Sequence, residues 1–554
     1  MPEWLQLFTL ARFGRPVLLL AGLYAGLWLI ARGLRLRFTA GTTAGSAARH
    51  FVLVIPATAF VSFICIASWY AADKRYYDFA EPTMPSVAWM FESGKPLYPP
   101  PAAAEQYAHI YGPMAFIPLA VAMRLLGTDL SVTKSVGTAA GILALLVLFA
   151  ILKSRAGTRL AVLCTGQCAI FMLVFRNAAF WSRPDSLELL GMSIGLWAAL
   201  RRSRAGWIVL GVSAGLLWNL KFSGPLYSLP LFVLFLERAG RQRVVLAGAT
   251  AAIVVVLPFV VFHNISFHDY RTWILLSAGN GIDSSTLRHN IEWVLFVMAP
   301  LGFALYLSVR AAYAKASARS RRSALREGGQ HPLTVLSPAV AISLVVAVCS
   351  IAVLAAKPGS GPYHLLPFFP VIVFFTGMQI HHLQFDGDRT NVSVAAVAFT
   401  TAAAVIALAQ QASFITTVRQ IDAIRPMADI MRFLNKHPEA VTQMGYSSDE
   451  RMTFVRPLIV ARSGMYLLDQ PAIQEHQLAG VELPPATLNA LRSCVVTYWL
   501  IPKYGEPFSA VNRYPMTHDR ALFGSEFRRA FFDSYRRSES TDYFDVWACV
   551  AAKQ

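Results

Sequence analysis

Long apolar segments are the feature of this 554-residue chain that most limits its fold. A helix needs about 20 consecutive apolar residues to cross the hydrocarbon core of a bilayer. The chain is 55% hydrophobic and only 14% charged, whereas soluble domains carry about 25% charged residues. We therefore predict a polytopic α-helical membrane protein with about 12 transmembrane helices. The predicted spans are 16–31, 51–71, 131–152, 160–180, 186–200, 207–220, 225–237, 244–262, 290–310, 333–356, 363–380 and 392–412.

The distribution of charge excludes nucleic acid as the partner. The net charge is +18, but the Lys and Arg residues lie in short clusters between the apolar segments. Cytoplasmic loops of membrane proteins carry an excess of Lys and Arg. One alternating set of predicted loops holds 20 of these residues and the opposite set holds 9, so we place the first set in the cytoplasm.

This orientation divides the chain into three parts. Residues 1–50 are an N-terminal transmembrane segment with a cytoplasmic loop, 51–412 a transmembrane domain, and 413–554 an extracytoplasmic domain. The large loop 72–130 lies on the outer face. We interpret 111–127 as an amphipathic or re-entrant helix at that face, because counting it as a span would turn the following Arg clusters outward.

Four polar stretches interrupt the apolar pattern on the predicted outer face. They lie in the loop that begins "ADKRYYDFAEP", in "WSRPDS" (181–186), in "NLKFSGP" (219–225) and in "KPGSGPYH" (357–364). Asp185 in the second stretch is also explained as the N-cap of the next helix. However, charged residues at membrane depth are costly and usually functional. We expect the four stretches to converge on one outward-facing site.

The residue types in these stretches suit a phosphate group at the membrane surface. Glycines in "KPGSGP" free backbone N–H groups to approach an anion closely, and a partly dehydrated phosphate attracts cations strongly. The candidate ligands are the cations Lys221, Lys357 and Arg183 and the hydrogen-bond donors His364, Tyr363 and His109.

Two carboxylates in the first outer loop complete the predicted chemistry. Glu81 and Asp78 lie close together in "YYDFAEP". A carboxylate beside a phosphate site can accept a proton from an attacking hydroxyl while the cations stabilise the departing phosphate. The same pair could instead hold a divalent metal such as Mg²⁺ or Mn²⁺, and the sequence indicates no other cofactor.

The order of these motifs resembles the GT-C superfamily of membrane glycosyltransferases, which use sugars carried on polyprenyl phosphate. The resemblance covers about 51–554, and it is to the branch of the lipid A aminoarabinose transferases and protein O-mannosyltransferases. The motifs that carry it are "EPTMPSVAWMFESGKPLY" with "YGP", then "SRPD", "NLKFSGPLY" and "KPGSGPYHLLPFFP". Each is weak alone, but the set in this order is fairly specific.

The resemblance implies an inverting glycosyl transfer on the outer face of the bacterial cytoplasmic membrane. The implied donor is a polyprenyl monophosphate sugar, and the implied acceptor is a glycolipid, a glycan or a protein. Glu81 is the implied base or metal ligand, with Asp78 as its rival. Related enzymes place a Lys before the surface helix where this chain has "HIYGP", so His109 or Tyr111 would take its place at the phosphate.

In the same resemblance, the three later motifs hold the donor phosphate. Lys221, Lys357 and His364 are its implied ligands, and Arg183 assists them. Asp185 has an implied role in acceptor binding or in support of the site.

From about residue 413 the apolar runs end, and the sequence predicts a small α/β domain. "IRPMADIMRFLNKHP" and "PPATLNALRS" are typical of helices. "VTQMGYS" and "SCVVTYWLIP" are typical of strands, and "AFFDSYRRSESTDYFDVWACV" of a hairpin that turns at "RSES". Cys494 and Cys549 each lie on a predicted strand. In an oxidising compartment they would form a disulfide, while two buried thiols are the alternative.

Three other functions fit parts of the pattern. A transporter or flippase of lipid-linked sugar would also need phosphate-binding cations, but the sequence shows no inverted repeat of broken spans. An enzyme resembling O-antigen ligases would use a diphosphate donor. A non-catalytic scaffold would have the same fold without the transferase activity. The large outer loop and the outer domain favour an enzyme.

Overall fold

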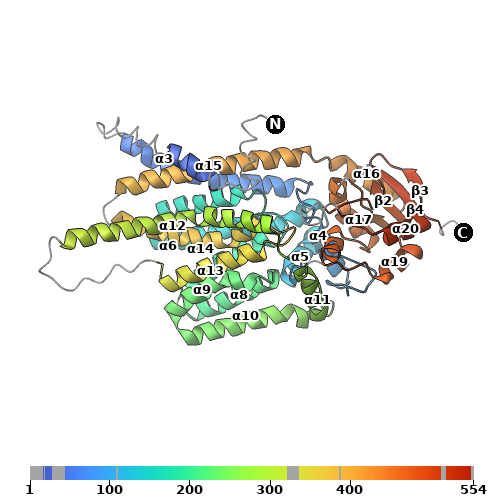
Figure 1. Ribbon diagram of the computed structural model, residues 1–554, viewed down its shortest axis with the longest axis horizontal. Coiled ribbons are helices and arrows are strands. Elements are labelled where there is room, and N and C mark those ends of the chain that lie inside the picture. Colours follow the sequence, from blue (N-terminus) through green and yellow to red (C-terminus); the bar gives the residue numbers. More distant parts are fainter. Residues whose placement is uncertain are drawn as a thin grey trace.

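The structure of this chain, a computed structural model, describes residues 17, 19–27, 44–107, 110–201, 203–320, 336–385, 389–448, 450–503, 505–512 and 520–550. Long helices lie side by side in an elongated bundle, and the C-terminal part of the chain forms a separate domain at one end of it (Figure 1). The long bundle helices are α3 (Ala44–Ala72), α6 (Leu130–Val174), α10 (Arg241–Val261), α12 (Ser284–Ser320), α14 (Phe369–Phe385) and α15 (Arg389–Gln420). The shorter ones are α7 (Asp185–Ala199), α8 (Arg204–Leu220), α9 (Gly224–Ala239) and α13 (Pro338–Leu354).

Helix α6 is 45 residues long and consists of two antiparallel halves. The chain turns at Gly157, whose φ of 82° falls in the region that glycine tolerates without strain. The first half packs closely against the segment that follows the second half, because a Cβ on Gly137 would collide with the main-chain oxygen of Trp181. The hydroxyl of Thr138 also donates to the carbonyl of Phe180 at 3.3 Å. The two spans expected at 131–152 and 160–180 therefore form a hairpin.

The helices agree with the predicted spans in position, and the chain is a multi-pass membrane protein. Five stretches of the described residues are long and apolar enough to cross a membrane by themselves: Leu53–Ala72, Leu130–Val174, Arg241–Val261, Pro362–His382 and Ala398–Lys436. Helices α7, α8 and α9 are short, as the sequence indicated, with 15 to 17 residues each. The total of twelve spans stays a prediction. Part of the first one, 16–31, lies outside the described residues, although Leu20 packs in the core of the bundle.

A layer of short helices lies between the bundle and the C-terminal domain (Figure 1). It contains α4 (Thr83–Glu92), the 3₁₀ turn η1 (Pro113–Ala115), α5 (Ile117–Leu126) and α11 (Phe267–Ala278). Helix α5 has only 10 residues and exposes Leu125 and Leu126. It is shorter than the roughly 20 residues that a span needs, which agrees with the interpretation of 111–127 as a helix at the membrane surface, and its place on the outer face stays a prediction.

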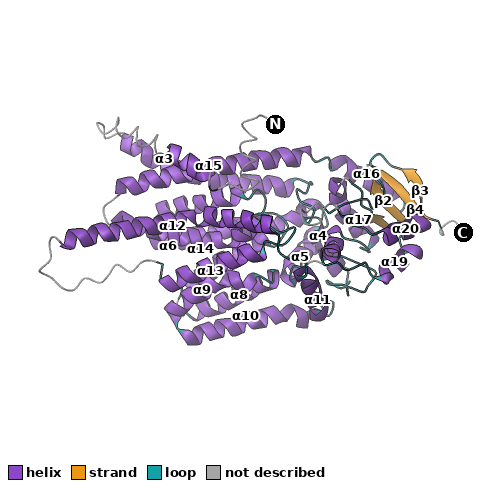
Figure 2. Ribbon diagram, viewed as in Figure 1, coloured by secondary structure: helices purple, strands orange, loops and turns teal. Residues whose placement is uncertain are grey.

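The C-terminal domain carries the four-stranded sheet of the described chain, seen at one end of the molecule in Figure 2. The strand order is β1-β2-β4-β3, with β1 parallel to β2 and the other pairs antiparallel. The strands are β1 (Thr442–Met444), β2 (Tyr498–Pro502), β3 (Tyr535–Ser540) and β4 (Phe544–Cys549). The helices are α16 (Ile424–Lys436), α17 (Arg456–Ser463), α18 (Gln470–Leu478), α19 (Pro485–Arg492) and α20 (Ser525–Ser534), with the 3₁₀ turn η3 (Glu450–Val455).

The predicted elements of this domain are largely confirmed. The two expected helices are α16 and α19, and the expected strands are β1 and β2. The predicted position of the hairpin turn is wrong. "RSES" lies within β3, and the chain turns at 541–543 instead. Alternation of charged residues with serine suits a strand with one solvated face. Helix α15 runs to Gln420, past the predicted boundary at 413.

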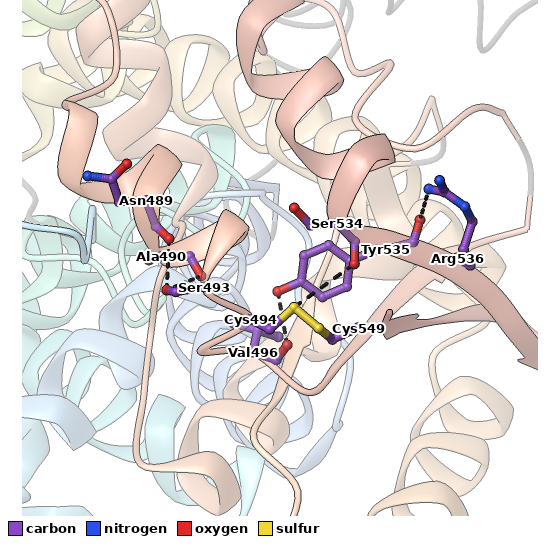
Figure 3. Close-up of a disulfide and its surroundings, with 9 residues drawn as sticks. All are labelled: Asn489, Ala490, Ser493, Cys494, Val496, Ser534, Tyr535, Arg536 and Cys549. Carbon is purple, nitrogen blue, oxygen red and sulfur yellow. Dashed lines mark hydrogen bonds between the residues drawn. A yellow bond between two sulfur atoms is a disulfide. The ribbon is translucent and has the colours of Figure 1, made fainter. Parts of the chain in front are cut away.

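A disulfide joins Cys494 to Cys549, across a sequence separation of 55 residues and with Cα atoms 5.8 Å apart (Figure 3). Of the two alternatives for this pair, the structure therefore has the disulfide. Beside it, the hydroxyl of Tyr535 donates to the carbonyl of Val496 at 2.9 Å. The bond links the segment before β2 to the end of β4 and so closes the sheet covalently.

Candidate active site

Glu81 lies in the loop between α3 and α4 and is fully buried. Its Oε2 atom accepts hydrogen bonds from the hydroxyl of Tyr70 at 2.6 Å and from the backbone N–H groups of Tyr77 and Asp78 at 3.1 and 3.3 Å. The side-chain amide of Asn177 also donates to it at 3.3 Å. The Oε1 atom has no hydrogen-bond partner among the described residues. One carboxylate oxygen is therefore anchored, and the other is available to a proton donor.

Lys134 of α6 holds the start of this loop. It is buried, and its ammonium donates to the carbonyls of Tyr70, Asp73 and Arg75 at 3.2, 2.7 and 2.6 Å. Carbonyls at the end of a helix lack intrahelical partners, and Lys134 supplies one for the end of α3. Sequence reasoning missed this residue, although a Lys inside an apolar run is a signal of function or pairing.

Burial raises the pKa of Glu81, because its charged form is disfavoured away from water. The charge of Lys134 opposes that shift, and so does the hydrogen bond from Tyr70. The carboxyl therefore titrates above its ordinary range, which brings it closer to the pKa of a useful general base.

Asp78 connects the acidic loop to Arg183. A guanidinium nitrogen of Arg183 lies 3.4 Å from Oδ1 of Asp78. The same guanidinium donates to the hydroxyls of Tyr111 at 3.0 Å and Tyr363 at 2.7 Å. It also lies over the ring of Trp181, 4.2 Å from the centroid. Arg183 thus brings together residues from three of the four predicted stretches.

Lys221, at the end of α8, lies between two buried carboxylates. Its ammonium is 2.5 Å from Oδ1 of Asp185 and 3.0 Å from Oε2 of Glu188. Burial disfavours the charged ammonium, but the two carboxylates outweigh this effect and hold the pKa of Lys221 well above its usual range. The charge of Lys221 is therefore compensated within the protein.

The prediction that Asp185 caps α7 is wrong. Pro184 occupies the N-cap position and Asp185 is the first helical residue. The Asp185 carboxylate accepts from Lys221 and from the indole N–H of Trp181 at 3.0 Å. Sequence reasoning missed Glu188, which follows Asp185 by three residues and therefore lies on the same helix face.

His364 joins the Lys221 cluster to the last predicted stretch. Its Nδ1 atom lies 3.4 Å from the ammonium of Lys221, and its carbonyl accepts from the hydroxyl of Tyr227 at 2.9 Å. His364 belongs to the 3₁₀ segment η2 (Pro362–Phe368), directly after the turn that contains Lys357. The turns at 221 and 357–364 therefore lie at the same end of the bundle.

Lys357 points toward the C-terminal domain. Its ammonium donates to the hydroxyl of Ser277 on α11 at 2.5 Å and to Oε1 of Glu475 on α18 at 3.3 Å. Its side chain is 21% exposed. Gly359, two residues on, has a φ of 80°, and its carbonyl accepts from the hydroxyl of Tyr363 at 3.3 Å. The tight turn at 357–361 thus needs a glycine at this position.

Of the two residues considered in "HIYGP", Tyr111 lies in the site and His109 lies outside the described residues. Burial raises the pKa of Tyr111 above its usual range, so the phenol stays protonated. The main chain beside it is fixed, because the hydroxyl of Tyr98 donates to the carbonyl of Tyr111 at 2.7 Å.

The described residues contain no group of three or more His, Cys, Asp or Glu side chains with the spacing of a metal site. Glu81 and Asp78 are the pair considered for a divalent metal. Oε1 of Glu81 has no hydrogen-bond partner among the described residues, whereas Oδ1 of Asp78 accepts from the backbone of Ala80 and from Arg183.

Comparison with known proteins rests on structure alone, because no family model and no curated protein matches this sequence. The crystal structure of ArnT from Cupriavidus metallidurans bound to undecaprenyl phosphate superposes with a TM-score of 0.53 at 14% sequence identity, over 89% of this chain and 98% of that one. The apo form of ArnT gives 0.52 at 12% identity, over 89% and 97%. The chain has the GT-C fold. The predicted helical membrane fold with a small C-terminal sheet is thereby confirmed, and the number of spans stays a prediction.

A third solved structure matches this chain over about half of its own length. The arabinosyltransferase EmbB from Mycobacterium smegmatis matches with a TM-score of 0.38 at 12% identity, over 89% of this chain and 47% of EmbB.

Proposed function

We propose that this protein is a glycosyltransferase that moves a sugar from a polyprenyl monophosphate to an acceptor at the membrane surface. The observation that supports it is a continuous set of contacts from an acidic loop to a basic turn. Asp78 meets Arg183, Arg183 meets Tyr363, and the neighbouring His364 meets Lys221. The fold of a protein crystallised with undecaprenyl phosphate agrees with this class of donor.

We assign the direct phosphate contacts to Arg183 and Lys357. The ammonium of Lys221 is shared by two carboxylates, which would repel a phosphate placed beside it. Lys221 then acts mainly by holding His364 and the end of α8. Arg183 meets a single carboxylate at 3.4 Å and otherwise neutral hydroxyls. Lys357 is partly exposed and can exchange Glu475 for a phosphate.

The transfer itself needs one base and one stabilised leaving group. An acceptor hydroxyl or amine attacks the anomeric carbon, and its proton passes to a carboxylate. The bond between that carbon and the phosphate oxygen breaks, and polyprenyl phosphate leaves with the electron pair. Arg183 and Lys357 stabilise the negative charge that develops on the phosphate oxygen. Attack from the side opposite the phosphate inverts the anomeric centre.

Glu81 is the base that we favour, and Asp78 is the alternative. Glu81 has a free oxygen and a raised pKa, both of which suit proton abstraction. It is also fully buried, whereas the side chain of Asp78 is 24% exposed. An acceptor must therefore reach a buried oxygen to use Glu81 as its base, whereas Asp78 can be reached from the surface.

The disulfide supports an outer location for the C-terminal domain and the site beneath it. Disulfides persist in oxidising compartments such as the bacterial periplasm. Cys494 and Cys549 form one in this domain, and α18 of the same domain contacts Lys357 through Glu475. The active site then faces the outer side of the cytoplasmic membrane, in agreement with the excess of Lys and Arg in the opposite loops.

The deciding experiment supplies the purified protein in lipid vesicles with radiolabelled polyprenyl monophosphate sugars and a membrane extract as the source of acceptor. Release of polyprenyl phosphate supports the proposal, and Glu81→Gln and Arg183→Gln should abolish the release with the protein still folded. Movement of the intact lipid-linked sugar across the vesicle membrane without cleavage contradicts it and indicates a flippase. Repetition with EDTA, and then with added Mg²⁺ or Mn²⁺, decides whether a metal takes part.

A further inference from the structure

A buried arginine of the C-terminal domain reaches into the acidic loop. Arg456, the first residue of α17, is fully buried. One of its guanidinium nitrogens donates to the carbonyl of Phe79 at 2.7 Å and to the hydroxyl of Thr83 at 2.8 Å. Phe79 and Thr83 stand two residues before and two residues after Glu81. The guanidinium therefore contacts the main chain and a side chain on both sides of the candidate base.

Asp469 completes the contact. Its Oδ1 atom accepts from the hydroxyl of Thr83 at 3.0 Å and lies 3.3 Å from the guanidinium of Arg456. The hydroxyl of Tyr466 donates to the same oxygen and accepts from Arg456 at 3.0 Å. Both charged side chains are fully buried. Thr83 is thus held by a cation and an anion at once, each from the C-terminal domain.

A buried ion pair is a costly way to join two parts of a protein. Replacing such a pair by hydrophobic residues of similar volume is often neutral or even stabilising. The pair is therefore weak evidence for stability, and a role in fixing the local geometry explains it better. Here the pair fixes the position of one short loop. The carbonyl of Glu81 is held from a further side, because the hydroxyl of Ser182 donates to it at 3.3 Å.

We propose that Arg456 and Asp469 act through Thr83 as positioning residues, which hold the loop of Glu81 at the geometry that the transfer needs. The inference rests on the proposed function and adds a catalytic task to the C-terminal domain. A small misplacement of a catalytic group can lower a rate about a hundredfold. Loss of the contact should therefore lower kcat far more than it changes donor binding, since the phosphate contacts are made by other residues.

Thr83→Val is the sharpest variant, because it keeps the shape of the side chain and removes only the hydroxyl. Thr487→Val is its matched control. Thr487 is also a fully buried threonine of the interface between the C-terminal domain and the outer loop, and its hydroxyl donates to the carbonyl of Ala104 at 2.8 Å. We expect Thr83→Val to lower kcat at least about tenfold with donor KM within about twofold, and Thr83→Ser to restore it. The control should retain most of the wild-type kcat. Equal losses in the two valine variants, or no loss in Thr83→Val, would overturn the proposal.

A second readout works without catalysis. The amides of Tyr77 and Asp78 donate to Glu81, so their hydrogen exchange reports whether the loop is held. Exchange in this segment should be faster in Thr83→Val and in Arg456→Lys, and unchanged in Thr487→Val. Unchanged exchange in the first two variants contradicts the positioning role. If the wild-type protein releases no polyprenyl phosphate, the proposed function fails, and hydrogen exchange alone decides the positioning claim.

Discussion

Lys221 and Asp185 form a salt bridge of 2.5 Å in which the side chains are 5% and 0% exposed. Glu188 lies 3.0 Å from the same ammonium. One positive charge thus faces two carboxylates, and the formal charge of the three side chains together is negative. The charges come from the end of α8 and the start of α7, so the pair ties two helices together at the candidate site. The same ammonium lies 3.4 Å from Nδ1 of His364, so the cluster also reaches the turn before α14.

Replacement of Lys221 by Met should destabilise the protein strongly. Removing one partner of a buried ion pair typically costs about 3–5 kcal/mol because a charge remains unpaired. The double variant Lys221→Met/Asp185→Asn should lose much less than the sum of the two single variants. Thermal unfolding of the three variants in detergent measures this coupling. Additivity within about 0.5 kcal/mol would show that the two side chains do not interact.

The pH dependence of transfer should report the buried state of Glu81. The base must be ionised to accept a proton, and burial raises its pKa. As the pH falls, kcat/KM should therefore begin to decline at a higher pH than the ordinary carboxyl value of about 4.3 would give. Glu81→Gln should lower kcat by about 10²–10⁴-fold and remove this acidic limb, while the hydrogen bonds to its other oxygen are kept.

Asp78→Asn is the control for that experiment. It should weaken the contact with Arg183 and raise donor KM, yet retain the acidic limb of the pH profile. If Asp78→Asn removes the limb and Glu81→Gln keeps it, the roles of the two carboxylates are reversed.

The sequence predicted the helices and the composition of the site better than its individual contacts. The order of spans and the charge of the loops place Lys221 and His364 at one end of the bundle, because a helix that crosses a membrane has its ends on opposite sides. Asp185 and Glu188 share a face by spacing alone. In contrast, the pairing of Lys221 with these acids depends on how α7 packs against α8, and no local pattern contains that information.

Contacts across long sequence distances were beyond prediction for the same reason. Arg456 lies in an ordinary polar stretch, and its partner Thr83 precedes it by 373 residues. Lys357 was predicted as a phosphate ligand, and nothing in the sequence indicated that it also contacts Glu475 of the C-terminal domain. The disulfide could be predicted from the sequence, because both cysteines lie on predicted strands of one small domain.

Glu475→Gln should improve donor binding if Lys357 contacts the donor phosphate. In the structure the ammonium of Lys357 is paired with Glu475 at 3.3 Å, and a phosphate must displace this carboxylate. Its removal should lower donor KM, with the largest effect at low ionic strength. Glu482→Gln, which removes an exposed carboxylate of the same domain, is the control and should leave KM unchanged. A higher KM in Glu475→Gln would mean that the pair itself, rather than free Lys357, serves the donor.

Loss of the disulfide should destabilise the C-terminal domain without unfolding the helical bundle. A loop of 55 residues corresponds to about 4 kcal/mol in the chain-entropy account. Cys494→Ala/Cys549→Ala should therefore make this domain more sensitive to protease. Alkylation of the wild-type protein should modify these two cysteines only after reduction. Modification before reduction would show that the bond is not formed in the cell.

Cysteine labelling should place the two ends of α8 on opposite sides of the membrane. Ser203 precedes this helix and Phe222 follows Lys221 after it, and both side chains are exposed. In a background without the four free cysteines, a membrane-impermeant maleimide should label Phe222→Cys in intact cells and Ser203→Cys only after permeabilisation. The cysteines to be replaced are Cys65, Cys164, Cys168 and Cys349. Since Lys221 contacts His364 directly, the label at 222 also reports the side on which the Lys357 turn lies. Labelling of Ser203→Cys alone in intact cells would put the acidic loop and its basic partners in the cytoplasm, and the donor would then have to be bound from that side.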